Sequence, residues 1–298
     1  MTDTKTPTPS AGQQCLAQAQ QLLAAGDPVA ASPLLLRARA EKDTMLAAHA
    51  LIEQYDLNGS FRNITGLDCT VSAADDIFGF FAGHPSSINP LRDYFADGWR
   101  TLAELMAVME RVGQPLVQTQ HFLEFASGHG RFTRHLVKLL GTDKVTVSDV
   151  VGDAVDFATK TFGVQGFLSA SVPEQLAVPR KYSVVFVLSL FSHLPRHTWA
   201  RWLQALYETV EPGGILVIST HGIKAANFHH VPLDEEGFFF APSSESHAID
   251  PNEYGTAFTT EAFVRARIAE TVGIDQLEYF APVQFWNHQD VYVLRRKA

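Results

Sequence analysis

Cysteine is nearly absent from this chain of 298 residues, which contains only Cys15 and Cys69. Two cysteines cannot form a disulfide framework, so the sequence predicts a protein of a reducing compartment. Residues 1–10 lack the apolar stretch of a secretory signal, and the longest strongly apolar run, 184–191, is too short to span a bilayer. We therefore expect a cytoplasmic protein without a membrane partner.

An excess of positive charge is also missing. The formal net charge is −9, with 23 basic and 32 acidic residues. Because a nucleic-acid-binding protein needs a basic footprint, this balance argues against a nucleic-acid partner. The hydrophobic content of 46% and the charged content of 18% are typical of a globular protein. The length suffices for one large domain with an appendage, or for two domains.

The most informative stretch is 122–137, with the sequence FLEFASGHGRFTRHLV. Its apolar start predicts a short buried strand over 122–125, and small residues predict a turn over 126–130. Apolar residues then recur at helical spacing as far as Gly141, which is suited to end a helix. A strand, a glycine turn and a helix form the nucleotide-binding opening of many α/β sheets, because the backbone can approach a ligand there.

A carboxylate one strand further on indicates which part of a nucleotide is bound. Residues 144–148 predict the next strand, and Asp149 follows it. An acidic residue about 20 positions after the glycine turn is placed to accept hydrogen bonds from two ribose hydroxyls. The dinucleotide fingerprint, however, requires a glycine where this chain has Ala126 and a small residue where it has Thr133. The sequence therefore predicts a ribose-containing ligand and disfavours a nicotinamide cofactor.

The segments LEFASGHGRF and VTVSDVVGDAVDFA (145–158) resemble motif I and its successor in class I S-adenosylmethionine-dependent methyltransferases. The resemblance extends from about residue 94 to the C-terminus, and Tyr94 belongs to a Tyr-Phe-x-x-Gly element that precedes motif I in a bacterial subset of the family. It implies S-adenosyl-L-methionine as the cofactor. It also implies that Glu124 lies under the methionine end, that Asp149 holds the ribose and that Val150 lies against the adenine. The expected cofactor-binding residues are Tyr94, Glu124, Ala126, Ser127, Gly128, Gly130, Asp149, Val150, Ser169, Ala170, Ser189 and Leu190.

The chain departs from the family pattern at two places. Ala126 replaces the usual glycine, and we expect this residue to be tolerated if its φ angle is negative. After the third strand, the family commonly has a carboxylate for the adenine amino group, whereas this chain has Ser169 and Ala170. The adenine would then be held by backbone groups, by a serine or by water.

The resemblance implies an α/β fold with a doubly wound, mostly parallel seven-stranded sheet of the Rossmann-like kind, whose last strand is antiparallel and lies beside the sixth. Helical periodicity near the start of the chain adds an N-terminal helical segment. The expected organisation is a disordered tail (1–10), a tetratricopeptide-like helical hairpin (11–56), a helical cap (57–120) and a cofactor-binding domain (121–298) with a lid (223–258). The lid segment is too long for a plain connection. Its histidines and acidic residues lack the tight spacing of metal ligands, so we expect no metal site.

Candidate acceptor-side residues come from the ends of later strands. The fifth strand, 215–220, should deliver His221 to the carboxyl edge of the sheet. If the last strand is antiparallel, the turn around 282–289 brings Trp286, His288, Gln289 and Asp290 to the same edge. A hydroxyl acceptor needs a base, and histidine is the usual one near neutral pH. We therefore expect His221 to act as the base, assisted by Asp290 or His288. For His193, a structural role is favoured over a catalytic one.

The predicted reaction is methyl transfer from S-adenosyl-L-methionine to a small-molecule acceptor, preferably to a hydroxyl group of a sugar or a secondary metabolite. Three alternatives remain open. They are N-methylation of a small amine, a catalytically silent S-adenosylmethionine-binding scaffold and, less favoured, a nicotinamide-dependent oxidoreductase. The N-terminal helices are a plausible surface for a homo-oligomer. The identity of the acceptor does not follow from the sequence.

Overall fold

The computed structural model describes residues 8–244 and 249–297. The chain forms two compact units, Met1–Leu91 and Arg92–Ala298. Most of the predicted N-terminal tail lies outside the described residues.

The first unit is helical. Helix α1 begins with a capping box, in which the backbone N–H of Gln13 donates to the Ser10 hydroxyl at 3.1 Å and the Gln13 side chain accepts from the Ser10 N–H at 3.0 Å. The first three helices bury Ala19, Leu35 and Ile52 in a shared cluster, so they cover each other's apolar faces. The helices are α1 (Ala11–Ala24), α2 (Pro28–Arg39), α3 (Met45–Gln54), α4 (Phe61–Thr65) and α5 (Asp76–Gly83).

The second unit is built on a seven-stranded sheet with the order β3-β2-β1-β4-β5-β9-β8. All neighbours from β3 to β5 pair in parallel, whereas β9 is antiparallel to both β5 and β8. The predicted fold class is therefore confirmed, including the antiparallel last strand. The strands are β1 (Phe122–Phe125), β2 (Val145–Asp149), β3 (Gln165–Leu168), β4 (Tyr182–Val187), β5 (Val210–His221), β8 (Leu277–Phe285) and β9 (Gln289–Arg295).

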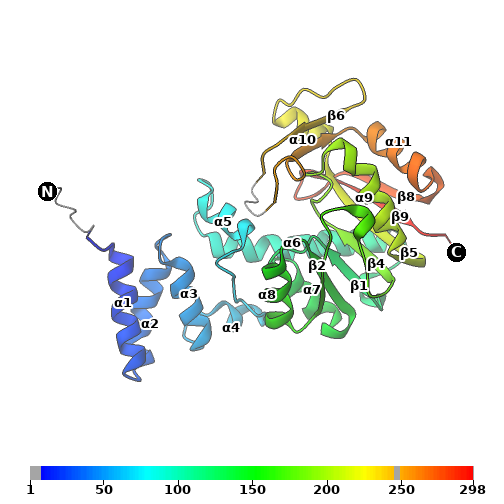
Figure 1. Ribbon diagram of the computed structural model, residues 1–298. Coiled ribbons are helices and arrows are strands. Elements are labelled where there is room, and N and C mark those ends of the chain that lie inside the picture. Colours follow the sequence, from blue (N-terminus) through cyan, green and yellow to red (C-terminus); the bar gives the residue numbers. More distant parts are fainter. Residues whose placement is uncertain (1–7, 245–248, 298) are drawn as a thin grey trace. The chain divides into compact units, whose positions relative to one another are not determined.

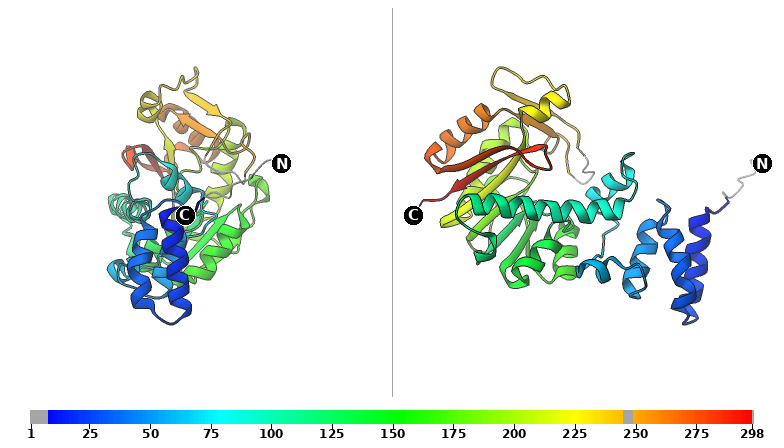
Figure 2. Two further views of the ribbon diagram at one scale, coloured as in Figure 1. Left: turned by 90° about the vertical axis from the view of Figure 1, so that its left-hand side faces the viewer. Right: turned by 180° about the vertical axis from the view of Figure 1, so that it is seen from behind.

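Helices cover both faces of this sheet (Figures 1 and 2). On one face, side chains of α6, α7 and α8 pack against alternate strand residues such as Phe122 and Phe186. On the other face, α9 and α11 pack against the intervening residues, such as Leu123 and Val185. This alternation is what the period of two along a strand requires. These helices are α6 (Pro90–Arg111), α7 (Thr133–Leu140), α8 (Gly152–Phe162), α9 (Arg196–Glu208) and α11 (Glu261–Thr271).

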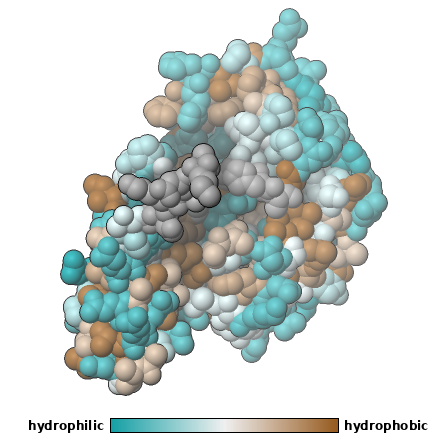
Figure 3. Space-filling view, turned by 60° about the vertical axis from the view of Figure 1, so that its left-hand side comes forward, coloured by the Kyte–Doolittle hydropathy of each residue, from teal (hydrophilic) through white to brown (hydrophobic). Residues whose placement is uncertain are grey.

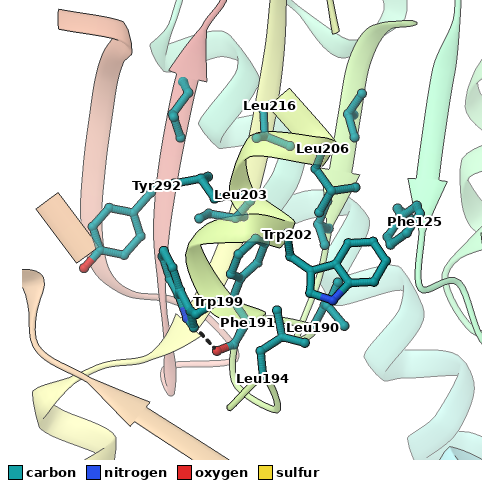
Figure 4. Packing of buried hydrophobic residues seen from close by; sticks show 14 of the residues in the cluster. Phe125, Leu190, Phe191, Leu194, Trp199, Trp202, Leu203, Leu206, Leu216 and Tyr292 are labelled. Atoms are coloured by element: carbon teal, nitrogen blue, oxygen red, sulfur yellow. Dashed lines mark hydrogen bonds between the residues drawn. The ribbon is translucent and has the colours of Figure 1, made fainter. Parts of the chain in front are cut away.

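The segment after β4 is anchored in the core (Figure 4). Leu190, Phe191 and Leu194 are buried around Trp199 of α9, whose indole N–H donates to the Phe191 carbonyl at 3.3 Å. Burying one such apolar side chain stabilises a fold by about 1.5–3 kcal/mol. The chain that leaves β4 is thereby held in place beside the ends of β1 and β5. The side chain of Leu190, expected to contact the cofactor, belongs to this core.

The segment 223–258 contains more regular structure than its sequence pattern suggests. Helix α10 (Ile223–Phe228) is followed by β6 (Phe238–Ala241) and β7 (Thr256–Thr259), which form an antiparallel pair. Consecutive phenylalanines conceal the strand alternation, because Phe238 packs on Phe263 whereas Phe239 lies near Phe258. Residues 245–248 of this segment lie outside the described part.

The hairpin between the last two strands is also tighter than expected. β8 continues to Phe285, so the turn is confined to 286–288 instead of 282–289. Trp286 and Asn287 both have φ +56°. Two positive φ angles match the right-handed twist of the flanking strands.

On the side drawn in Figure 3, hydrophilic and hydrophobic residues are interspersed. No helix of the described residues is long and apolar enough to cross a membrane.

Candidate cofactor and acceptor site

The turn after β1 adopts backbone angles that ordinary residues avoid. Gly128 has φ +54° and Gly130 has φ +80°, and Ala126 also has a positive φ, of +58°. The condition under which Ala126 was expected to be tolerated, a negative φ angle, is therefore not met. A non-glycine residue in this region costs about 1–2 kcal/mol, because Cβ approaches a carbonyl oxygen. Such strain tends to occur at functional sites, where the surrounding structure maintains it.

The two glycines of this turn are required for different reasons. A Cβ at Gly130 would overlap the ring of Phe162, whereas a Cβ at Gly128 would meet no atom within 4 Å. Gly130 thus packs against α8. Gly128 borders open space, which leaves room for a ligand against its backbone.

Asp149 connects this turn to the end of β2. One carboxylate oxygen accepts from the backbone N–H of Gly128 at 2.8 Å, and the other accepts from the N–H of Val151 at 2.9 Å. The side chain is nearly buried, and burial raises its pKa above the ordinary value. A carboxylate has about four acceptor positions, so each oxygen can still accept a hydroxyl hydrogen. Asp149 is suited to bind a pair of hydroxyl groups.

A second buried carboxyl lies beneath the turn. Glu124 of β1 accepts a hydrogen bond from the Thr133 hydroxyl, at the start of α7, at 2.7 Å. Burial raises the pKa of Glu124 to about 8, although the Thr133 hydrogen bond opposes this rise and the Asp149 charge adds to it. Two carboxyl groups that share a low-dielectric site favour a cationic group beside them.

The remaining predicted cofactor residues lie around the same strand ends. Ser127 donates its backbone N–H to the Ser148 carbonyl at 3.2 Å, and Ser169 donates its own to the Asp149 carbonyl at 2.8 Å. The Ser169 hydroxyl points to the Ala170 carbonyl, at 3.3 Å. The side chain of Val150 is 36% exposed at the end of β2. The two backbone hydrogen bonds join the strand ends at this edge of the sheet, and the apolar side chain of Val150 lies at its surface.

Tyr94 reaches the glycine turn through an arginine that the sequence did not indicate. The guanidinium of Arg134 lies 5.5 Å from the centre of the Tyr94 ring and 4.9 Å from that of Phe162. Its Nε donates to the Gly130 carbonyl at 3.1 Å. Arg134 therefore stabilises the turn through this hydrogen bond and through its contacts with the two rings. Its position among helical residues gave no signal of this role.

Polar side chains converge on Gln289 at the ends of β4, β5 and β9. The Ser219 hydroxyl donates to its Oε1 at 2.6 Å, and its Nε2 donates to the Ser189 hydroxyl at 2.8 Å. The same Nε2 lies 3.3 Å from Nε2 of His221. Ser189 has φ +64°, so strain occurs here as well as at Ala126. Gln289 thus links the β4 end of the cofactor region with the end of β5.

Both ring nitrogens of His221 have partners. Nδ1 lies 3.2 Å from the Ala257 carbonyl, which can only accept, so Nδ1 carries the hydrogen and Nε2 accepts from Gln289. The ring stacks on Phe258 with centroids 4.9 Å apart. Burial and the neighbouring His193 and His288 lower the pKa of His221 to about 3. The imidazole is neutral across the physiological range.

Asp290 and His288 flank Gln289 but face different surroundings. The Asp290 carboxylate accepts from the backbone N–H of Val283 at 2.8 Å and packs so closely on Gly222 that a Cβ there would overlap it. Burial raises its pKa. The ring of His288 instead lies 5.1 Å from that of His221.

Trp286, expected beside these residues, turns toward α6. Its indole N–H donates to the Thr101 hydroxyl at 3.1 Å, and its backbone N–H donates to Glu104 at 3.0 Å. The side chain therefore attaches the hairpin turn to α6.

Two further histidines belong to this edge. The Nδ1 atom of His193 lies 2.6 Å from the Gly255 carbonyl, and its ring stacks on Tyr254 at 4.4 Å, which supports the structural role favoured from sequence. His229, after α10, lies 5.3 Å from His288. No local sequence pattern indicates that contact, because 58 positions lie between the two residues.

Comparisons with known proteins add the following. Residues 122–214 match a family model described as a methyltransferase domain. Similar solved structures include DesVI of Streptomyces venezuelae, at 16% identity and a TM-score of 0.49, covering 76% of this chain and 99% of that one. They also include magnesium protoporphyrin IX methyltransferase of Synechocystis PCC 6803 with bound SAH, at 15% identity and a TM-score of 0.47, covering 74% and 94%. No curated protein sequence matches the chain.

Proposed function

We propose that this chain, whose residues 122–214 match a methyltransferase domain, is a class I S-adenosylmethionine-dependent methyltransferase. It would transfer a methyl group from S-adenosyl-L-methionine to a hydroxyl group of a small molecule such as a sugar or a secondary metabolite. The observation that carries the proposal is the strained turn 126–130 joined to Asp149 by the 2.8 Å hydrogen bond from Gly128. The open space beside Gly128 and the free acceptor positions of Asp149 suit a ribose.

The residues present fit this cofactor. Asp149 would hold the ribose hydroxyls, and the exposed side chain of Val150 would lie against the adenine. Glu124 and the turn 126–130 would face the methionine end, where a buried carboxyl suits a cationic group. No carboxylate follows β3, so the Ser169 hydroxyl and backbone would meet the adenine amino group. Tyr94, Ser127, Ala170, Ser189 and Leu190 would complete the pocket, Leu190 through its backbone.

The cofactor supplies a reactive methyl group on a sulfonium, so the protein has mainly to align the acceptor and exclude water. The chain's own contribution to chemistry is acceptance of a proton. We propose that the histidine group containing His221 and His288, with Asp290 beside it, takes the proton of the hydroxyl acceptor. The segment 223–258 supports this role as a lid, because His193 and His221 hold its residues Gly255 and Ala257 against the strand ends.

A transfer assay tests the proposal. S-adenosylmethionine labelled in its methyl group is incubated with the full chain and a panel of phenols and monosaccharides, each matched with its amine counterpart. We expect label in hydroxyl products. Label in amines alone would replace O-methylation with N-methylation, and cofactor binding without any transfer would favour a silent scaffold.

We also propose that the protein acts in the cytoplasm. Its two cysteines are both buried and free, which suits a reducing compartment. For the first unit, we propose self-association through the helices of 11–56. Light scattering on the full chain and on a chain without these helices would test this proposal.

A further inference from the structure

Three imidazoles form a row at the acceptor edge. His221 lies 5.1 Å from His288, which lies 5.3 Å from His229, measured between ring centroids. They come from the end of β5, from the β8–β9 turn and from the segment after α10. Over residues 8–244 and 249–297, no group of three histidine, cysteine or acidic side chains has the geometry of a metal site. The row therefore invites an explanation other than metal binding.

Both ring nitrogens of His221, the first histidine of the row, take part in hydrogen bonds within the protein. His221 donates through Nδ1 to Ala257 and accepts through Nε2 from Gln289. A proton on Nε2 would place two donors against each other and would disconnect Gln289 from His221. His221 is thus a positioning residue, which fixes Gln289 and the lid residue Ala257.

His288, the second histidine of the row, differs from His221 in this respect. In the part of the chain that the structure describes, neither ring nitrogen of His288 makes a hydrogen bond within the protein, and the side chain is only partly buried. Burial and the neighbouring His229 lower its pKa, so the ring is neutral at neutral pH and able to accept a proton. The groups facing it are His221 and His229, whereas Asp290 is directed to Val283 and Gly222.

The position of His288 connects it to the cofactor region. It directly precedes Gln289, whose amide donates to the Ser189 hydroxyl at 2.8 Å. Phe258, which is buried, stacks on His221 and lies 5.8 Å from His229, so it supports the row from the interior of the protein. An acceptor would reach the row from its exposed side, where the ring of His288 is only partly buried. The exposed His229 lies on the side of the row toward solvent.

From this arrangement we infer that His288, and not His221, takes the proton of a hydroxyl acceptor, and that His229 beside it passes the proton to solvent. The inference rests on the proposed function. In the step, the acceptor O–H bond breaks and its proton goes to a ring nitrogen of His288. The oxygen forms a bond to the methyl carbon as the S–CH₃ bond breaks, and the sulfur keeps that electron pair.

Methyl transfer to the hydroxyl panel gives the first test. We expect His288→Ala to lower transfer by about 10²-fold or more, and added imidazole to restore part of it. His230→Asn is the matched control, because His230 is an exposed neighbour of His229 with φ +54°, an angle that asparagine tolerates. This control should transfer at the wild-type rate. Wild-type transfer by His288→Ala, or transfer to amines alone by the wild type, overturns the inference.

Carbethoxylation gives the second test and needs no acceptor. The full chain is treated with diethyl pyrocarbonate at neutral pH, and each modified histidine is located by mass spectrometry. We expect His288 and His229 to react several times faster than His221, whose nitrogens are both engaged. Reaction of His221 at the rate of His288 overturns the inference, whether or not the panel yields a product.

Titration with S-adenosylhomocysteine separates the two possible failures. His288→Ala should bind it as tightly as the wild type, because His288 is assigned to the acceptor. If the wild type itself does not bind it, the proposed function fails. If the wild type binds it and either test above gives the contrary result, only the assignment of His288 fails.

Discussion

The two edges of the candidate site are built in different ways. The cofactor edge comes from two short continuous stretches, 122–130 and 145–151, which pair as strands β1 and β2 and are joined beyond the strands by hydrogen bonds from Ser127 to Ser148 and from Gly128 to Asp149. The acceptor edge is assembled from the ends of β4, β5 and β9 and from the lid, which are far apart in the chain. A cofactor shared by many enzymes can be bound by a local motif, whereas the acceptor is met by residues that only the complete fold brings together.

The two edges also differ in electrostatics. The cofactor edge contains two buried carboxyl groups, Glu124 and Asp149, whose pKa values burial raises. The acceptor edge contains neutral imidazole, amide and hydroxyl groups, and burial lowers the pKa of His221 and His288. Under the proposed function, the first edge suits a cationic group, and the second suits a neutral acceptor and its proton.

The glycines of the cofactor edge should differ sharply in their tolerance of a methyl group. Gly130→Ala adds backbone strain and overlap with the Phe162 ring, so we expect a loss of about 2–4 kcal/mol in the free energy of unfolding. Gly128→Ala adds strain alone, and we expect a loss of about 1 kcal/mol. Urea denaturation of both variants measures the difference. Equal losses would show that packing against α8 is unimportant.

Glu124 should make the protein less stable as the pH rises. Its pKa is raised from 4.5 in the unfolded chain to about 8 in the fold, so between these values the folded state retains a proton that the unfolded state has lost. This contribution is complete below about pH 4.5 and is lost as the pH rises through 8, with a slope of at most about 1.4 kcal/mol per pH unit. Glu124→Gln should flatten the dependence of melting temperature on pH in this range. An unchanged dependence would place the titration elsewhere.

His221, at the acceptor edge, should make the protein less stable as the pH falls. Its pKa is lowered from 6.5 to about 3, so between these pH values the unfolded chain binds a proton that the folded protein does not bind. The contribution is complete above pH 6.5 and is lost as the pH falls toward 3. His221→Asn should reduce the loss of stability on acidification from pH 6.5, in the same melting experiment. NMR titration of the wild type provides a check, since a His221 resonance that shifts near pH 6.5 would contradict this assignment.

Ala126→Gly should produce the smallest change. It relieves strain of about 1–2 kcal/mol but increases the entropy of the unfolded chain by about 0.4–1 kcal/mol. We expect a net stabilisation of about 0.5–1 kcal/mol in urea denaturation. A destabilised variant would mean that the Ala126 side chain makes contacts worth more than its strain.

The sequence predicts the cofactor edge better than the acceptor edge. Strand β1, the cap at Gly141 and the antiparallel last strand follow from periodicity or from the family resemblance, and the structure confirms them. The φ angle of Ala126 could not be predicted, because an alanine gives no sign that its neighbours force it into a glycine conformation. His229 was assigned to a solvated lid, since nothing local indicates a ring that lies beside His288. Gln289 was expected near the acceptor, but its role as a hydrogen-bonding centre depends on Ser189 and Ser219.

The glycine turn and the β2 carboxylate are proposed to bind the nucleoside, and isothermal titration of the wild type and Asp149→Ala with S-adenosylhomocysteine measures whether they do. The account predicts measurable binding by the wild type and a loss of roughly 1.5–3 kcal/mol, about 10- to 100-fold in affinity, for the variant. Equally tight binding by both proteins would contradict it.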